Sequence, residues 1–250
     1  MTAKRLPTAT LILAALAGSG ALLIPQETAA QALTLDLGDG GELTSRVIQF
    51  IALLTVLSLA PSILVMVTSF TRIVIVLSLM RSALGVQQTP PNSVIVSLAL
   101  FLTFFVMAPT LERTYTEGIL PLINEEIDEG ESFKRSIRPV HEFMIAHVRE
   151  KDLELFVNMA GGAKPESVED IPLHVLIPAF VISELRRAFE IGFLIFIPFI
   201  VIDMVVASVL MSMGMMMLPP IMISLPFKLI FFVLVDGWNL VTGSLVQSFG

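Results

Sequence analysis

Two histidines are the first residues to examine for chemistry, because His141 and His147 lie close together with Glu142 beside the first. A zinc protease helix carries two histidines four residues apart, so that both reach one metal ion. Histidines six residues apart lie on different faces of a helix, and the chain has no cysteine to complete a metal site. No phosphate-binding loop has the required spacing. The sequence therefore predicts no metal, no cofactor and no enzyme.

Charged side chains inside apolar segments are the second group of candidates. The apolar region 175–250 contains seven of them, which are Glu184, Arg186, Arg187, Glu190, Asp203, Lys228 and Asp236. Charges at membrane depth are costly and usually face a bundle interior or a water-filled cavity. Arg186 and Glu190 are spaced for pairing on one helix, as are Glu184 and Arg187. Three interpretations stay open: an ion pathway, pairing between helices and subunits of an assembly, or segments that do not lie in lipid.

Methionines gather in the same region, where seven of the thirteen lie between positions 204 and 222. Three are consecutive within the run Gly214, Met215, Met216, Met217, Leu218, Pro219, Pro220. The glycine and the proline pair prevent a continuous helix from passing. Backbone that is not helical needs hydrogen bonds from protein or water, since lipid offers none. Because methionine is flexible and polarisable, this Met-rich loop (211–220) is typical either of a soft apolar constriction facing a passage or of gap filling in a helical core.

The elements that position these residues belong to a membrane protein. The 250 residues are 55% hydrophobic with a mean hydropathy of +0.86, and the net charge of −7 comes without any basic tract for nucleic acid. The start of the chain resembles a secretory signal: Lys4 and Arg5 precede a short apolar stretch, and Ala30 and Ala32 offer a small-x-small cleavage site. We predict cleavage after Ala32, which leaves 33–46 as a short segment outside the cytoplasm.

Two apolar regions flank a polar one. Val47–Thr71 is long enough to cross a bilayer, and a second helix runs from about Asn92 to Leu111, with Pro90 and Pro91 at its start. The charges between them, Arg72 and Arg81, are both positive, and positive loops stay in the cytoplasm. The sequence thus predicts an apolar helical hairpin at 47–111, a periplasmic helical domain at 112–174 with an apolar stripe over Pro139–Asn158, and a second hairpin at 175–250. The fold class is all-α.

Long stretches of the chain resemble the FliP family of type III export-gate proteins. The matching stretches are Met66–Arg72, Arg81–Gly85 with Pro90–Asn92, Leu98–Phe105, Phe189–Asp203, Ala207–Pro220 and Leu225–Trp238. They cover both apolar regions. The wording of the Met-rich loop and the N-terminal signal are more similar to the flagellar branch than to the sister branch that serves the virulence injectisome.

This resemblance implies a function that the residues alone do not give. The chain would be one subunit of a pentameric ring, built with the export-gate proteins FliQ and FliR and with other membrane proteins of the export apparatus. The ring would conduct unfolded flagellar proteins across the bacterial inner membrane at the flagellar basal body. The resemblance places Met215, Met216 and Met217 at the channel constriction, Gly214, Pro219 and Pro220 at helix breaks beside it, and the seven charged residues in assembly. It also implies hairpins raised largely out of the bilayer, with lipid as a partial contact. The alternatives are an ion or small-solute transporter subunit and an injectisome export-gate subunit.

Overall fold

The computed structural model describes residues 42–86, 88–161, 167, 170–215 and 218–250. The predicted signal segment, with Ala30 and Ala32, lies outside the described residues. The chain divides into two compact units, residues 1–55 and 56–250. Helix α2 (Glu42–Val67) begins in the first unit and ends in the second. All regular elements in the described part of the chain are helices, which confirms the predicted all-α fold.

After α2, the described part of the second unit contains nine helical elements. Their bounds, in chain order, are α3 (Phe70–Ala83), α4 (Asn92–Thr114), the π-helical turn η2 (Tyr115–Ile119), α5 (Leu120–Ile123), α6 (Glu129–His147), α7 (Glu150–Ala160), α8 (Leu173–Ser212), α9 (Pro220–Leu234) and α10 (Gly237–Gln247). Helix α4 begins after Pro91, as predicted, but extends three residues past Leu111 and continues through η2 into α5.

Among the residues that the structure describes, two helical stretches, Asn92–Ile123 and Leu173–Ser212, are long and apolar enough to cross a membrane. Two bent pairs also qualify if each pair is taken as one span: Arg46–Leu59 with Pro61–Val67, and Pro220–Leu234 with Gly237–Gln247. The 40 residues of α8 extend over about 60 Å, roughly twice the thickness of a hydrocarbon core. Only part of α8 can therefore lie in a bilayer, which agrees with the charges that it carries.

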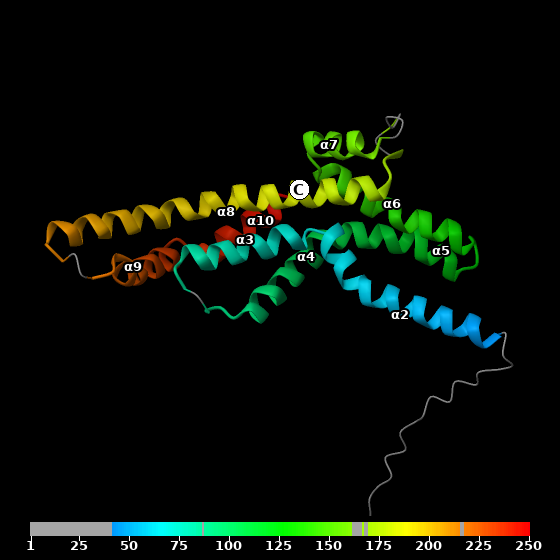
Figure 1. Cartoon of the computed structure of the whole chain (residues 1–250), viewed down its shortest axis with the longest axis horizontal. Helices are drawn as coiled ribbons and strands as arrows, with labels where there is room; N and C mark the ends of the chain where they lie inside the picture. Colours follow the sequence, from blue (N-terminus) through cyan, green and yellow to red (C-terminus); the bar gives the residue numbers. More distant parts are fainter. Residues whose placement is uncertain (1–41, 87, 162–166, 168–169, 216–217) are drawn as a thin grey trace, which may run out of the picture. The chain divides into compact units, whose positions relative to one another are not determined.

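Helices α3, α4, α9 and α10 surround the main apolar core on one side of α8 (Figure 1). Helix α3 packs closely against α8 at Gly192: a Cβ added there would lie 2.3 Å from Leu79 Cδ1, so a larger residue would require the Leu79 side chain to move. The apolar side chains of α3 that are almost fully buried in this packing are Ile73, Val76, Leu77 and Met80. The region 47–111 therefore contains a buried helix, α3, which lies in the sequence between the two helices predicted for its hairpin.

A second core lies between α6, α7 and the first turns of α8. Its buried members are Met144, Ile171, Val175, Leu176 and Phe180. All the apolar residues of the stripe predicted over 139–158 pack into this core, which confirms the stripe. They come from two helices, however, because α6 ends at His147 and α7 begins at Glu150. The bend lets one apolar surface wrap around the start of α8.

Candidate functional site

The Met-rich loop begins where α8 ends. Gly214 has φ +73°, and its backbone N–H donates to Met211 O at 3.1 Å, while the N–H of Met215 donates to Leu210 O at 3.0 Å. These two bonds form a Schellman motif, which ends a helix with glycine in the left-handed conformation. Pro219 then precedes the first turn of α9, where Pro220 loses no helical hydrogen bond. Gly214 thus ends α8 and the proline pair starts α9, each through the backbone conformation of a helix cap.

Within this loop, Met215 is 44% exposed and Leu218 is 46% exposed. Met216 and Met217 lie outside the described residues. The exposed thioether of Met215 makes the loop apolar toward its surroundings rather than part of a packed core. In a single chain the loop therefore has apolar side chains available for another surface or for a passage.

Asp203 of α8 and Lys228 of α9 form an ion pair between these two helices. Lys228 Nζ lies 2.6 Å from Asp203 Oδ2 and donates to Ala83 O at 3.3 Å. The hydroxyl of Ser224 donates to the other Asp203 oxygen at 2.5 Å. Lys228 is only 5% exposed. A desolvated cation of this kind is tolerated because its charge is paired and two of its three protons have acceptors. The pair joins α9 to α8 and to the end of α3.

A cavity of about 650 Å³ lies beside this pair. Its walls include Phe196, Phe199 and Leu225 together with Asp203 and Lys228. Because Asp203 and Lys228 are engaged with each other, the cavity has mostly apolar walls with a neutralised ion pair at one side, and Arg81 also lines it. This arrangement suits a packed protein neighbour better than a hydrated ion path.

The other predicted charges lie at the surface of this chain. Arg186 Nε lies 2.8 Å from Glu190 Oε1, and both side chains are exposed, so the predicted i,i+4 pair is present. Arg187 is also exposed and does not pair with Glu184, contrary to the spacing argument. Asp236 is exposed at the bend between α9 and α10, with φ 50°. Whether a neighbouring subunit covers these groups stays a prediction.

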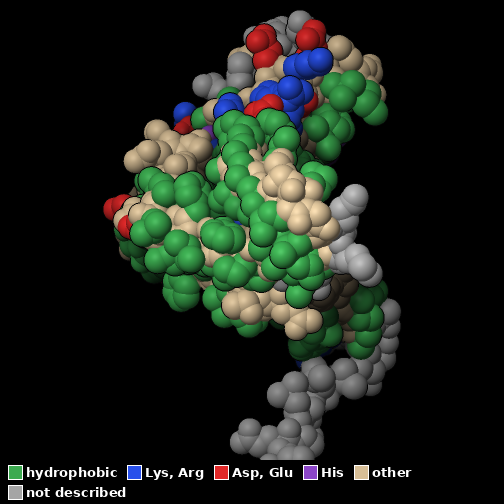
Figure 2. All heavy atoms as spheres, turned by 90° about the vertical axis from the view of Figure 1, so that its left-hand side faces the viewer, with side chains coloured by type: hydrophobic (Ala, Val, Ile, Leu, Met, Phe, Trp, Pro, Cys, Tyr) green, Lys and Arg blue, Asp and Glu red, His purple; other side chains and the backbone are tan. Residues whose placement is uncertain are grey.

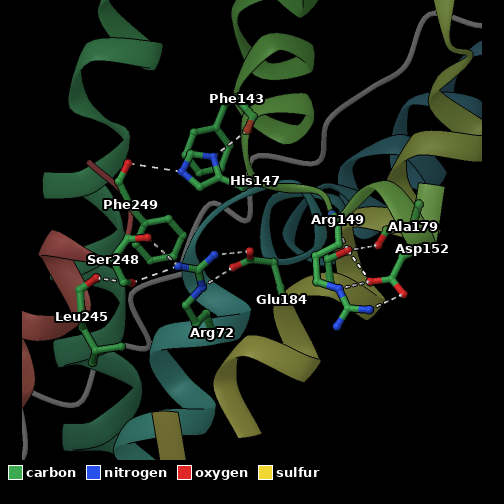
Figure 3. Close-up of polar contacts among 11 residues, drawn as sticks. Arg72, Phe143, His147, Arg149, Asp152, Ala179, Glu184, Leu245, Ser248 and Phe249 are labelled. Atoms are coloured by element: carbon green, nitrogen blue, oxygen red, sulfur yellow. Dashed lines mark hydrogen bonds and ion pairs between the residues drawn. The ribbon is translucent and has the colours of Figure 1, made fainter. Parts of the chain in front are cut away.

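Glu184 instead pairs with Arg72 of α3, and both residues are fully buried (Figure 3). Arg72 Nε donates to Glu184 Oε2 at 2.9 Å, and Nη2 donates to Glu184 Oε1. The remaining nitrogen, Nη1, donates to the backbone oxygen and the hydroxyl of Ser248 at 3.0 and 2.9 Å. This bidentate geometry uses the planar fork of arginine and leaves neither charge without a partner.

The aromatic ring of Phe249 closes the Arg72 cluster. The guanidinium carbon of Arg72 lies 3.7 Å from the centre of that ring, a cation–π contact. The backbone oxygen of Phe249 lies 3.2 Å from His147 Nε2, at the end of α6. Figure 3 shows these groups converging from α3, α6, α8 and the segment after α10. The cluster therefore ties four segments together at one point.

Next to it, α7 is fixed to α8 through Ser183. Its hydroxyl donates to Asp152 Oδ2 at 2.7 Å and accepts from the backbone N–H of Arg149 at 3.0 Å (Figure 3). The side chain of Arg149 also pairs with Asp152 at 3.2 Å.

The two candidate metal ligands of the sequence have other roles, since His141 Nε2 lies 2.9 Å from Ile171 O and His147 contacts Phe249 O.

The buried pair was the main feature that sequence reasoning missed. Arg72 was interpreted as a cytoplasmic loop charge, whereas it lies in the first turns of α3 with no exposed surface. The available signal was that Arg72 and Glu184 are charges of opposite sign that lie at the edge of or within long apolar stretches in opposite halves of the chain. Their signs are complementary, but nothing in the spacing of 112 residues identifies them as partners.

Large apolar side chains cover much of the outer surface of α4, α8 and α9. Among the most exposed are Phe101, Phe105, Phe193, Val233 and Leu234. Figure 2 shows a face on which hydrophobic side chains predominate and charged ones gather at one end. Exposed apolar patches of this size mark a membrane or protein interaction surface. The exposed apolar faces of α4, α8 and α9 are thus surfaces for contact with a membrane or with other proteins.

Comparison with known proteins gives the family. The sequence profile of the FliP family matches residues 53–245. The chain is 59% identical to the flagellar biosynthetic protein FliP of Caulobacter vibrioides over 239 residues, which are 95% of this chain and 90% of that protein. It is 59% identical to the Bacillus subtilis protein of the same name over 208 residues, 83% and 94% of the two chains. With the Rhizobium meliloti protein the identity is 52% over 243 residues, 96% and 98% of the two chains. The chain belongs to the FliP family.

Proposed function

We propose that this chain is a subunit of the flagellar type III protein-export gate, forming with further copies the conduit through which unfolded flagellar proteins cross the inner membrane. The observation that carries the proposal is the match to the FliP family over residues 53–245, which contain both candidate spans, the buried charge pairs and the Met-rich loop. Relatives named flagellar biosynthetic protein FliP are more than half identical over most of the chain.

The constriction of this conduit is formed by the gate methionines, defined as Met215, Met216 and Met217. Support comes from the helix ends on both sides of the loop and from the exposure of Met215. Exported chains differ in side-chain size, so a seal must adapt to each of them. Thioether side chains with three soft torsions can do so, and their apolar surface resists wetting when nothing passes.

The remaining surfaces serve assembly. The apolar faces of α4, α8 and α9, together with the exposed charges Arg187 and Asp236, fit contacts to further copies of this chain in a pentameric ring and to FliQ and FliR. Other export-apparatus membrane proteins and lipid cover the rest. On this proposal the 112–174 region lies in the periplasm and helps subunits meet.

The test is a combination of assembly and secretion. Co-expression with FliQ and FliR should yield a complex whose mass exceeds that of one copy of each and whose electron-microscopy images show a central channel. A strain without this chain should lose secretion of flagellar subunits, and the wild-type gene should restore it. Normal flagellar secretion without the chain, or solute flux through the isolated chain, would refute the proposal.

A further inference from the structure

Five of the seven charged side chains in the apolar region 175–250 form ion pairs within the chain. The remaining two are Arg187 and Asp236, which carry opposite charges and form no ion pair with any residue that the structure describes. We propose that Arg187 of one copy of this chain binds Asp236 of the neighbouring copy, an inference that rests on the ring of copies in the proposed function.

The carboxylates close to Arg187 on α8 are already engaged. Glu184 comes three residues earlier and is bound by Arg72 of α3. Glu190 comes three residues later and is bound by Arg186. The guanidinium of Arg187 therefore has a positive charge without a carboxylate of its own.

Both unpaired charges lie within exposed apolar surface. They belong to stretches that qualify as membrane spans, Asp236 at the bend between α9 and α10. Phe189, which is 59% exposed, follows Arg187, while Leu234 and Trp238 on either side of Asp236 are 79% and 40% exposed. A neighbour that covers these apolar side chains also removes water from the charges beside them. Such a charge is costly unless an opposite charge meets it.

The two charges of one chain are not placed to meet each other. The ion pair between α8 and α9 and the contact of Phe231 with Phe199 set one antiparallel register for these helices. Continued to the end of α9, this register brings Asp236 level with about Ile195. Ile195 is eight residues from Arg187, which a helix extends over about 12 Å. A pair between Arg187 and Asp236 therefore needs two copies.

Arg81 is the other cation in the apolar regions without a carboxylate partner, but it is already bound. Its Nη1 donates to Pro90 O at 3.2 Å and to Asn92 Oδ1 at 2.6 Å. It also lies on α3, outside the candidate spans. Arg187 is thus the cation that has free donors for Asp236 of another copy.

The pairing fixes how neighbouring copies are placed. The Arg187 end of the contact and the Asp236 end lie on different parts of the surface, so each copy binds one neighbour through each of them. Head-to-tail contacts of this kind build rings when the rotation closes. The separation of the two charges also requires neighbouring copies to be offset by about 12 Å along α8.

Single cysteines test the contact directly, because the chain has none of its own. Two differently tagged copies, one with Arg187→Cys and one with Asp236→Cys, are expressed together with the partners of the proposed gate. Membranes are then treated with a short bismaleimide, since an Arg–Asp pair holds two Cα atoms farther apart than the roughly 4.4–6.8 Å of a disulfide. We expect a cross-linked product that carries both tags.

The matched control replaces the first cysteine by Arg186→Cys, next to Arg187 but already paired with Glu190. Adjacent residues point to different sides of a helix, so this control should give several-fold less cross-linked product. The experiment requires no charge-reversed variant to fold.

A charge swap tests whether the contact contributes to assembly. Arg187→Asp and Asp236→Arg each place like charges across the interface, so the yield of ring on size-exclusion chromatography should fall about tenfold. The double variant restores opposite charges and should recover most of the yield.

The outcomes separate this pairing from the proposed function. A wild-type ring with no more cross-link than the Arg186→Cys control, or a double variant no better than the single ones, would overturn the pairing and leave the export gate standing. If wild-type copies form no complex with more than one copy, the pairing and the ring are both refuted.

Discussion

The Arg72–Glu184 pair gives the sharpest prediction. Replacing Glu184 by alanine leaves the Arg72 guanidinium with no exposed surface and no counter-charge. Its bonds to Ser248 and its contact with Phe249 remain, but neither supplies negative charge. Removing one partner of a buried ion pair costs about 3–5 kcal/mol of stability. For a chain of this size that cost corresponds to a fall in Tm of about 6–20 °C.

The assay is thermal unfolding in detergent, followed by near-ultraviolet circular dichroism. The matched control is Glu190→Ala, a glutamate on the same helix whose pair with Arg186 is exposed. Exposed pairs contribute about 0–1 kcal/mol, so the control should shift Tm by a few degrees at most. If Glu184→Ala and Glu190→Ala shift Tm equally, the burial argument is wrong.

The double variant Arg72→Met with Glu184→Leu provides a second check on the same reasoning. Replacing a whole buried pair by apolar side chains is often neutral or stabilising, because no desolvated charge remains. We therefore expect the double variant to recover most of the Tm lost in Glu184→Ala. A double variant less stable than Glu184→Ala would mean that Arg72 contributes chiefly through its contacts with Ser248 and Phe249.

Three further changes have defined outcomes. Asp203→Ala leaves Lys228 buried without its carboxylate, so the yield of assembled ring on size-exclusion chromatography should fall at least tenfold; unchanged yield with abolished secretion would indicate an energetic role instead. Replacing all three gate methionines by alanine should keep the ring intact but raise ion conductance in planar bilayers, since the apolar seal is shortened; equal conductance would return these residues to core filling. The hydrogen bond from Arg113 lowers the pKa of Glu142, so its stabilising effect is complete above the ordinary carboxyl range and is lost as pH falls through the lowered value; Glu142→Gln should be less stable than wild type at pH 7 and equal to it in acid, as unfolding curves at both pH values would show.

The sequence predicts those parts of the fold that depend on nearby residues. Gly214 marks the end of α8, and Pro219 with Pro220 marks the start of α9, because helix caps are set by local backbone conformation. The apolar stripe over 139–158 follows from helical spacing, but that spacing does not reveal the break between α6 and α7. In each case the physical cause lies within a few residues of the feature.

The missed features depend on contacts between distant segments or on competing local bonds. The partner of Glu184 is set by the approach of α3 to α8, which Gly192 permits and no spacing rule reveals. The break between α2 and α3 contains no glycine or proline. There Thr68 and Thr71 hydroxyls donate to backbone oxygens, of Leu64 at 2.8 Å and of Val65 at 2.9 Å. Such side chain–backbone bonds compete with the helix ladder.

The length of α8 separates the buried Arg72–Glu184 pair from the Met-rich loop. Glu184 near one end and Gly214 at the other are separated by thirty residues, which a helix extends over about 45 Å. The helix carries the Met-rich loop at its far end and is fixed to α3 by Arg72 and to α9 by the Asp203–Lys228 pair. A tilt of α8 by about 5° at Glu184 displaces Gly214 by about 4 Å at this length, on the order of one methionine side chain. On the proposed function, a change of tilt at the buried Arg72–Glu184 pair would therefore move Met215 relative to the conduit.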